Sequence, residues 1–236
     1  PGFRYSGTDT DATMKRLVAG LRRFQTEVFP EKQQLFKRLA DSQQPRALFI
    51  TCADSRVMPG LITQAAPGDL FICRNAGNIV PPYGETNGGV SATIEYAVMA
   101  LQVPNIIVCG HSDCGALRAV LNPDRVANMP TTASWLKHSE SARMVVKENY
   151  AGLSDEEALE VLIRANVVAQ IDHLRTHPSV ASRVARGDLN LYGWVYRIET
   201  GEMIGYDNES GSFRYMSEDD IPAATPRRRS LAGLRA

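Results

Sequence analysis

The sequence predicts an α/β fold with parallel strands, and three observations carry that prediction. Short apolar runs that end in polar loops occur at residues 47–51, 70–73 and 105–109, as expected of buried strands. A helical segment separates the second run from the third, and this order implies a parallel pair with a right-handed crossover. Alternating residues at 189–198, a short turn and a run at 203–206 predict a hairpin.

Composition limits the classes of protein to consider. The 236 residues can bury a sizeable core, and 44% hydrophobic with 22% charged residues is ordinary for a globular protein. A formal net charge of zero gives no reason to expect a nucleic-acid or membrane partner. No apolar run approaches the roughly 20 residues of a membrane helix. Without an internal repeat or a clear linker, we predict one domain over residues 1–236.

Cysteine usage and the first residues bear on location. Four cysteines in a chain of this length do not form a disulfide framework, and the first residues lack the apolar segment of a signal peptide. We therefore predict a cytoplasmic protein. The chain opens on Pro1 rather than on methionine, so an upstream targeting segment stays open as an alternative.

A helical arm is predicted over residues 11–42, before the first strand. A helix from Asp11 to Val28 follows from one apolar stripe with helical spacing, made of Met14, Leu17, Val18, Leu21, Phe24 and Val28. Pro30 is expected to end it. A shorter helix should follow, with the side chains of Leu35, Phe36 and Leu39 facing inward. A stripe outside the sheet must cover something, and a partner subunit is a reasonable candidate.

The α/β core is predicted over residues 45–206. Its helices are expected at 87–101, 116–121, 135–150, 154–176 and 178–187. The long helix at 154–176 opens with Ser-Asp-Glu-Glu, which is a capping box. The tail at 220–236 is rich in proline, alanine and arginine, and we expect it to be solvated and flexible rather than bound to an acidic partner.

Polar side chains follow two of the buried runs. Cys52, Asp54 and Arg56 alternate after the first run, and His111 and Cys114 follow the third. The carboxyl ends of strands are where ligands collect in an open α/β sheet, so these side chains should lie close together. Thiolate and imidazole suit zinc, and three protein ligands leave one position for water or substrate. The spacing favours a catalytic site with one zinc per chain, held by Cys52, His111 and Cys114.

Asp54 and Arg56 suit a supporting role at such a site. The carboxylate of Asp54 could accept a hydrogen bond from a water at the open position, or it could occupy that position itself. Arg56 could hold Asp54 in a two-bond pair and decide between those states. An arginine beside a carboxylate also keeps the carboxylate ionised.

Other interpretations of these residues stay open at this point. H-x-x-C alone is more often an inert cysteine with an ordinary loop histidine, and C-x-D-x-R alone is more often a surface salt bridge beside a core cysteine. A zinc-stabilised binding module without turnover and a metal-free Cys/His thiol enzyme are the rival functions. Cys73 and Cys109 lie inside apolar runs, and we expect them to pack in the core.

Taken together, the motifs resemble those of the β-class carbonic anhydrases. Residues 52–56 (C-A-D-S-R) match the family's C-x-D-S-R motif, and residues 110–115 (G-H-S-D-C-G) match its G-H-x-x-C-G motif. Residues 67–71 (P-G-D-L-F) and 74–78 (R-N-A-G-N) match the stretches between them. The resemblance runs from about residue 16 to residue 206 and is nearest to the bacterial cyanate-operon and cyanobacterial carboxysomal types.

The resemblance implies a four-stranded, mainly parallel sheet with an added edge strand, flanked by helices. It implies reversible hydration of carbon dioxide to bicarbonate and a proton, with zinc as cofactor and Asp54 and Arg56 as a catalytic dyad. It also implies a homodimer whose N-terminal helices pack on the partner subunit, with tetramers and octamers as larger assemblies. Relatives that hydrolyse carbon disulfide or carbonyl sulfide share the ligands, so that activity is an alternative. Carboxysomal or organellar targeting stays open.

The resemblance also implies a substrate pocket. Its residues would be Gln43, Phe71, Ala76, Tyr96 and Gly115, with the glutamine and the glycine N–H acting on substrate oxygen and the others lining an apolar pocket. The gated subgroup of the family has a tryptophan three residues before the first cysteine, and this chain has Phe49 there. We therefore predict a plant-type site that is open at neutral pH, with Asp54 paired to Arg56.

Overall fold

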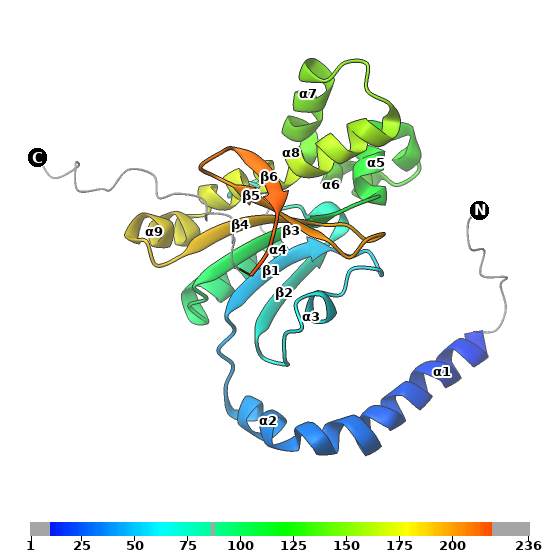
Figure 1. The fold of residues 1–236 in the computed structure, drawn as a ribbon, viewed down its shortest axis with the longest axis vertical. Helices are drawn as coiled ribbons and strands as arrows, with labels where there is room; N and C mark the ends of the chain where they lie inside the picture. Colours follow the sequence, from blue (N-terminus) through cyan, green and yellow to red (C-terminus); the bar gives the residue numbers. More distant parts are fainter. Residues whose placement is uncertain (1–9, 86–87, 219–236) are drawn as a thin grey trace, which may run out of the picture. The chain divides into compact units, whose positions relative to one another are not determined.

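The computed structural model describes residues 10–85 and 88–218, and the chain divides into two compact units (Figure 1). The first unit is Pro1–Gln43 and the second is Gln44–Ala236. The second unit holds the whole sheet and all the motifs described above. The tail predicted to be flexible, residues 220–236, lies outside the described residues.

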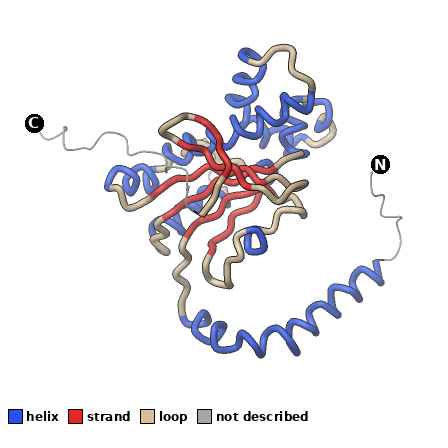
Figure 2. The backbone as a smooth tube through the Cα atoms, viewed as in Figure 1, coloured by secondary structure: helices blue, strands red, loops and turns tan. Residues whose placement is uncertain are grey.

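The described part of the N-terminal unit is one helical stretch, which Figure 2 traces without a break. It consists of α1 (Thr10–Arg23), a π-helical turn (Phe24–Val28) and α2 (Phe29–Asp41). The prediction that Pro30 ends the first helix is wrong. Proline lacks an N–H and its ring crowds the preceding turn, but here that turn is widened, with the Phe29 N–H donating to the Phe24 carbonyl. The apolar stripe of α1 is exposed within this unit.

The sheet has six strands in the order β2-β1-β3-β4-β5-β6. Their bounds are β1 Ala47–Cys52, β2 Leu70–Asn75, β3 Asn105–His111, β4 Asn190–Tyr196, β5 Met203–Asp207 and β6 Ser212–Tyr215. The first four strands in this order are parallel to one another. Strand β5 is antiparallel to β4, and β6 is antiparallel to β5. The predicted parallel core is confirmed. The antiparallel edge has two strands rather than one, because a turn at Gly211, with φ of 68°, returns the short β6 against β5.

Seven α-helices are described in the second unit. They are α3 (Pro59–Ile62), α4 (Gly89–Glu95, continued by a π-helical turn Tyr96–Ala100), α5 (Gly115–Leu121), α6 (Pro130–Leu136), α7 (Glu140–Asn149), α8 (Asp155–Thr176) and α9 (Pro178–Arg186). The capping box is present: Ser154 accepts from the Glu157 N–H, and Glu157 accepts from the Ser154 N–H at 2.9 Å. The helix predicted at 135–150 is instead two helices, α6 and α7, joined by a 3₁₀ turn at Lys137–Ser139.

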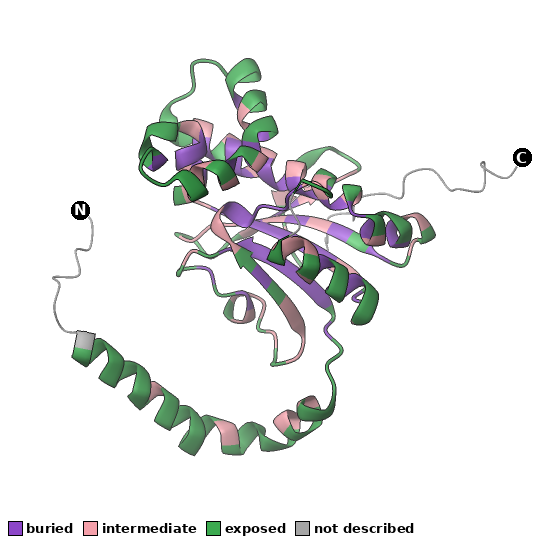
Figure 3. Ribbon diagram, turned by 180° about the vertical axis from the view of Figure 1, so that it is seen from behind, coloured by how far each residue is buried: buried purple, intermediate pink, exposed green. Residues whose placement is uncertain are grey.

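The core lies between α8 and the sheet, where Figure 3 shows the helix and strands buried. The close approach of α8 to β4 requires a glycine at position 193. A Cβ there would lie 2.8 Å from Val167 and 2.9 Å from Ile171, both on α8. A smaller apolar cluster, with Phe49 and Cys109, occupies the other face of the sheet. Strands buried on both faces read as continuous apolar runs, which is why the sequence revealed them. Cys73 and Cys109 are buried in these strands.

The length and apolar content of a helix decide whether it could span a membrane. Across the part of the chain that the structure describes, no helix has both the length and the hydropathy needed to cross a bilayer.

Candidate metal centre

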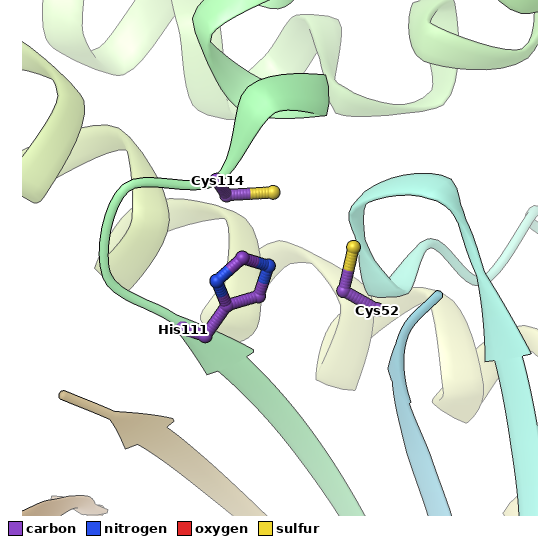
Figure 4. A group of neighbouring side chains, drawn as sticks. All are labelled: Cys52, His111 and Cys114. Atoms are coloured by element: carbon purple, nitrogen blue, oxygen red, sulfur yellow. The ribbon is translucent and has the colours of Figure 1, made fainter. Parts of the chain in front are cut away.

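Cys52, His111 and Cys114 converge at the carboxyl ends of two neighbouring parallel strands (Figure 4). Cys52 is the last residue of β1 and His111 the last of β3, and Cys114 directly precedes α5. All three are buried, and their ligand atoms lie within 4.8 Å of one another. Among the described residues they form the single group of this kind that could hold a metal ion. The sequence-based prediction that these side chains lie together agrees with this arrangement.

The turn between His111 and Cys114 is fixed by the neighbouring β4–β5 hairpin. The Ser112 N–H donates to the Tyr196 carbonyl at 2.8 Å, and the Ser112 hydroxyl donates to Glu199 at 2.6 Å. Asp113 has φ of 52°, the left-handed conformation that reverses the chain so that Cys114 faces back. Local geometry therefore places two potential ligands from one short loop.

The imidazole of His111 is oriented for a metal. Its Nδ1 lies 2.8 Å from the Ser112 carbonyl, an acceptor, so Nδ1 carries the proton. Its Nε2 is fully buried and has no hydrogen-bond partner within the described residues. A buried polar atom without a partner is costly, and a metal ligated by Nε2 would remove that cost. A ring nitrogen held by a carbonyl opposite the ligating nitrogen is the usual arrangement at zinc sites.

The two thiols differ in acidity. Cys114 donates a hydrogen bond to Cys52, and this contact, with the Gly77 N–H as a further donor, lowers the pKa of Cys52. The same contact and burial raise the pKa of Cys114. Two thiolates and one neutral imidazole match the ligands that zinc prefers and balance its charge. The residues present therefore fit zinc.

Asp54 and Arg56 form the predicted pair beside this group. Arg56 Nε donates to Asp54 Oδ1 at 3.0 Å, and Nη2 donates to Oδ2 at 2.8 Å. This pairing lowers the pKa of Asp54 to about 2, so the carboxylate is ionised at neutral pH. Asp54 Oδ2 lies 3.9 Å from His111 Nε2. The carboxylate is thus adjacent to the metal group while both its oxygens are held by Arg56.

Three supporting residues were not among the site residues predicted from the sequence. Arg74 donates to the carbonyls of Cys52 and Asp54, at 3.1 and 2.6 Å. The Gly77 N–H donates to Cys52 Sγ at 3.4 Å. Asp113 lies 3.4 Å from Arg56 and adds a second carboxylate to its guanidinium. Arg74 and Gly77 fall in the matched R-N-A-G-N stretch, which signals that they matter without saying what they contact.

The residues of the predicted substrate pocket are only partly brought together. The rings of Phe71 and Tyr96 pack with centroids 5.9 Å apart. Ala76 directly precedes Gly77, and Gly115 directly follows Cys114, so both are next to residues of the metal group. Gln43 is exposed and ends the N-terminal unit, which is not the unit that carries the metal group.

Comparison with known proteins decides the family. A model of the carbonic anhydrase family matches residues 47–203, which is more than half of the chain. A carbonic anhydrase of Pseudomonas aeruginosa is 49% identical over 205 residues, covering 87% of this chain and 93% of that protein. The solved β-carbonic anhydrase CcaA is 45% identical, with a TM-score of 0.88 over 92% of this chain and 96% of that one. The chain belongs to the β-class carbonic anhydrase family.

Membership of this family confirms several predictions. The chain is an enzyme, a carbonic anhydrase, and zinc is its cofactor. Its sheet, with parallel strands and an antiparallel edge, is that of a β-class carbonic anhydrase fold. A tetrameric β-carbonic anhydrase of Sordaria macrospora is 28% identical with a TM-score of 0.75, covering 86% of this chain and 99% of that one, so oligomers occur among similar structures.

Proposed function

We propose that this carbonic anhydrase catalyses the reversible, zinc-dependent hydration of carbon dioxide to bicarbonate and a proton at the Cys52–His111–Cys114 group. The observation that carries the proposal is the buried, unpartnered Nε2 of His111, which lies with two cysteine sulfurs in one group. Zinc held by these three residues would supply Lewis-acid activation of a water molecule. The remaining work falls to residues around the group.

Asp54 and Arg56 are proposed as the catalytic dyad. Asp54 is ionised and is placed beside the metal group, where it can accept a hydrogen bond from the attacking water and orient it towards carbon dioxide. Arg56 holds the carboxylate by two bonds, so Asp54 does not turn towards the metal itself. The site is therefore proposed to be open at neutral pH.

An apolar pocket is proposed for the substrate. Carbon dioxide has no net charge and no hydrogen-bond donor, so packed rings such as Phe71 and Tyr96, with the small side chain of Ala76, suit it better than charged groups. Bicarbonate needs polar partners as it forms. The Gly115 N–H and the Gln43 amide are proposed to supply them, the glutamine from the same chain or from the partner subunit.

A homodimer is proposed as the basic unit, with tetramers or octamers built from it. Residues 11–42 would serve as an arm on the partner subunit, within one domain that spans the chain. The support is that Leu17, Val18 and Leu21 of α1 are more than half exposed, an unusual state for neighbouring large apolar side chains. Sedimentation of native protein and of Leu17→Asp tests this, because a charge on the stripe should yield monomers. We propose a cytoplasmic location, in keeping with the four free cysteines.

The function is tested by stopped-flow carbon dioxide hydration measured together with zinc content. Native protein should hold about one zinc per chain and turn over rapidly, and Cys52→Ser should lose both properties. Cys73→Ser is the matched control, because Cys73 is also buried at a strand but lies outside the metal group. Loss of zinc in both variants would mean that the thiols act through folding rather than as ligands.

The same assay separates the rival functions. Zinc at full content without carbon dioxide hydration would favour the sulfur-substrate alternative or a binding module, and carbon disulfide hydrolysis would then distinguish these two. Activity that survives removal of metal by a chelator would favour a thiol enzyme and would end the zinc proposal.

A further inference from the structure

Two amide side chains are fully buried in the middle of α8. Asn166 and Gln170 lie one helical turn apart on a face that is otherwise apolar. Burying an amide is unfavourable unless its polar atoms find partners. Here each polar atom has one: Asn166 Oδ1 accepts from the Ser139 hydroxyl at 2.8 Å and from Gln170 Nε2 at 2.9 Å. The two amides and Ser139 thus form a connected polar network inside the core.

This network holds the segment that follows β2, residues 76–80. Asn166 Nδ2 donates to the Gly77 carbonyl at 3.1 Å. Gln170 Oε1 accepts from the Val80 N–H at 2.8 Å. The two ends of the segment are therefore tied to one rigid helix. Trp135 of α6 adds a third attachment, because its Nε1 donates to the Ala76 carbonyl at 2.9 Å.

Gly77 connects this network to the metal group. Its carbonyl is bound to Asn166, and its N–H donates to Cys52 Sγ. Its φ of 80° lies in the left-handed region, where glycine moves more freely than any other residue. The Gly77 N–H shares its peptide plane with the Ala76 carbonyl, which Trp135 holds, and the Gly77 carbonyl on the other side of the Cα is held by Asn166. The two bonds together fix both peptide planes that meet at Gly77.

We propose that Asn166, supported by Gln170, is a positioning residue that acts together with Trp135 to hold Gly77 so that its N–H points at the sulfur of Cys52. An N–H that donates to a ligating sulfur orients the sulfur and tunes the charge it gives to a metal. The effect reaches Cys52 through one residue, although Asn166 itself lies on another element. This inference rests on the proposed function, in which Cys52 is a zinc ligand.

The test uses Asn166→Leu in the full chain, a change that keeps approximate side-chain shape and removes the donor. Zinc affinity is measured by competition with a chelator, and the thiolate-to-metal absorption band is recorded after substitution with cobalt(II). We expect about 10- to 100-fold weaker zinc binding and a shifted cobalt band. Leu174→Ala is the control, because Leu174 is fully buried on the same helix but its side chain has no polar atom to hold the segment. It should lower thermal stability and leave both metal readouts unchanged.

Two outcomes would overturn the inference. One is native zinc affinity and an unshifted cobalt band in Asn166→Leu. The other is an equal loss of zinc affinity in Leu174→Ala, which would show that general destabilisation is the cause. If Asn166→Leu does not fold, Gln170→Met takes its place: it releases the Val80 N–H and should shift both readouts in the same direction, and native values would again refute the role. Failure of the native protein to show a thiolate–cobalt band would instead refute the proposed function.

Discussion

The carboxylate of Asp54 lies 3.9 Å from Nε2 of His111, yet both of its oxygens are engaged by Arg56. A carboxylate this near a metal group has two possible partners, the metal and the arginine. The structure has it on the arginine, with a pKa of about 2 that keeps it charged. This relationship is the basis of the first two predictions.

Replacing Arg56 with alanine should lower kcat for carbon dioxide hydration by about 100-fold or more, the scale at which a positioned acid–base group contributes. Without the guanidinium, Asp54 loses both side-chain bonds and is free to turn towards the metal. Stopped-flow kinetics measures the effect. Arg56→Lys is the matched variant: it keeps the charge but cannot make the two-bond pair, so its loss should be intermediate. Native kcat in Arg56→Ala would exclude the dyad role.

Bicarbonate should not inhibit the enzyme cooperatively near neutral pH. In the proposed open site, Asp54 is paired with Arg56 and leaves the metal position accessible, so bicarbonate is not expected to stabilise a closed state. Initial rates measured over a range of bicarbonate concentrations at constant ionic strength check this. A steep, sigmoidal loss of activity would contradict the prediction of an open site.

Stability should fall as the pH drops below about 6.5, the ordinary pKa of histidine, partly because of His177. Burial lowers its pKa, while its bond to the Pro81 carbonyl opposes that shift; His173 and Glu95 act more weakly and in opposite directions. The unfolded chain therefore takes up a proton in acid that the folded chain does not. Below the pKa that His177 has in the unfolded chain, the free energy of unfolding falls by up to about 1.4 kcal/mol per pH unit. Above that pKa, His177 does not lower the stability.

Urea denaturation at several pH values checks this contribution of His177. His177→Gln keeps a donor for the Pro81 carbonyl and does not titrate, so its stability should fall less steeply in acid than that of the native protein. Identical slopes for the two proteins would show that His177 does not cause the acid sensitivity.

Replacing Gly193 with alanine should destabilise the protein by about 1–3 kcal/mol, the usual cost of overpacking. The added Cβ would lie 2.8 Å from Val167 and 2.9 Å from Ile171, so α8 would have to move away from β4. Denaturant unfolding measures the loss. Gly20→Ala is the control in α1, where a Cβ meets nothing within 4 Å. There alanine should be neutral or stabilising, because it favours a helix by up to about 1 kcal/mol over glycine.

Local patterns predicted elements whose signal is carried by a few consecutive residues. The runs beginning at Ala47 and Asn105 are apolar throughout because β1 and β3 are buried on both faces. The run beginning at Leu70 was also predicted, although β2 is an edge strand and only partly buried. The capping box at Ser154 opens α8 as expected, since a cap is satisfied within one turn. Sequence patterns gave a wrong prediction at Pro30. Proline was expected to end the helix, but the π-helical turn before it relieves the steric clash, and no pattern in the sequence indicated that turn.

The sequence by itself determined the chemistry of the metal centre: two cysteines and a histidine at strand ends, with an acid and an arginine two and four residues after the first cysteine. Spacing within a loop accounts for His111 and Cys114, because ligands on one loop stay close in any fold. Cys52 joins them because β1 and β3 are neighbouring parallel strands whose carboxyl ends meet. Only the tertiary structure decided what surrounds them. Asn166 lies 89 residues from Gly77 in the chain, and a contact over that distance depends on how α8 packs against the sheet. No local pattern encodes it.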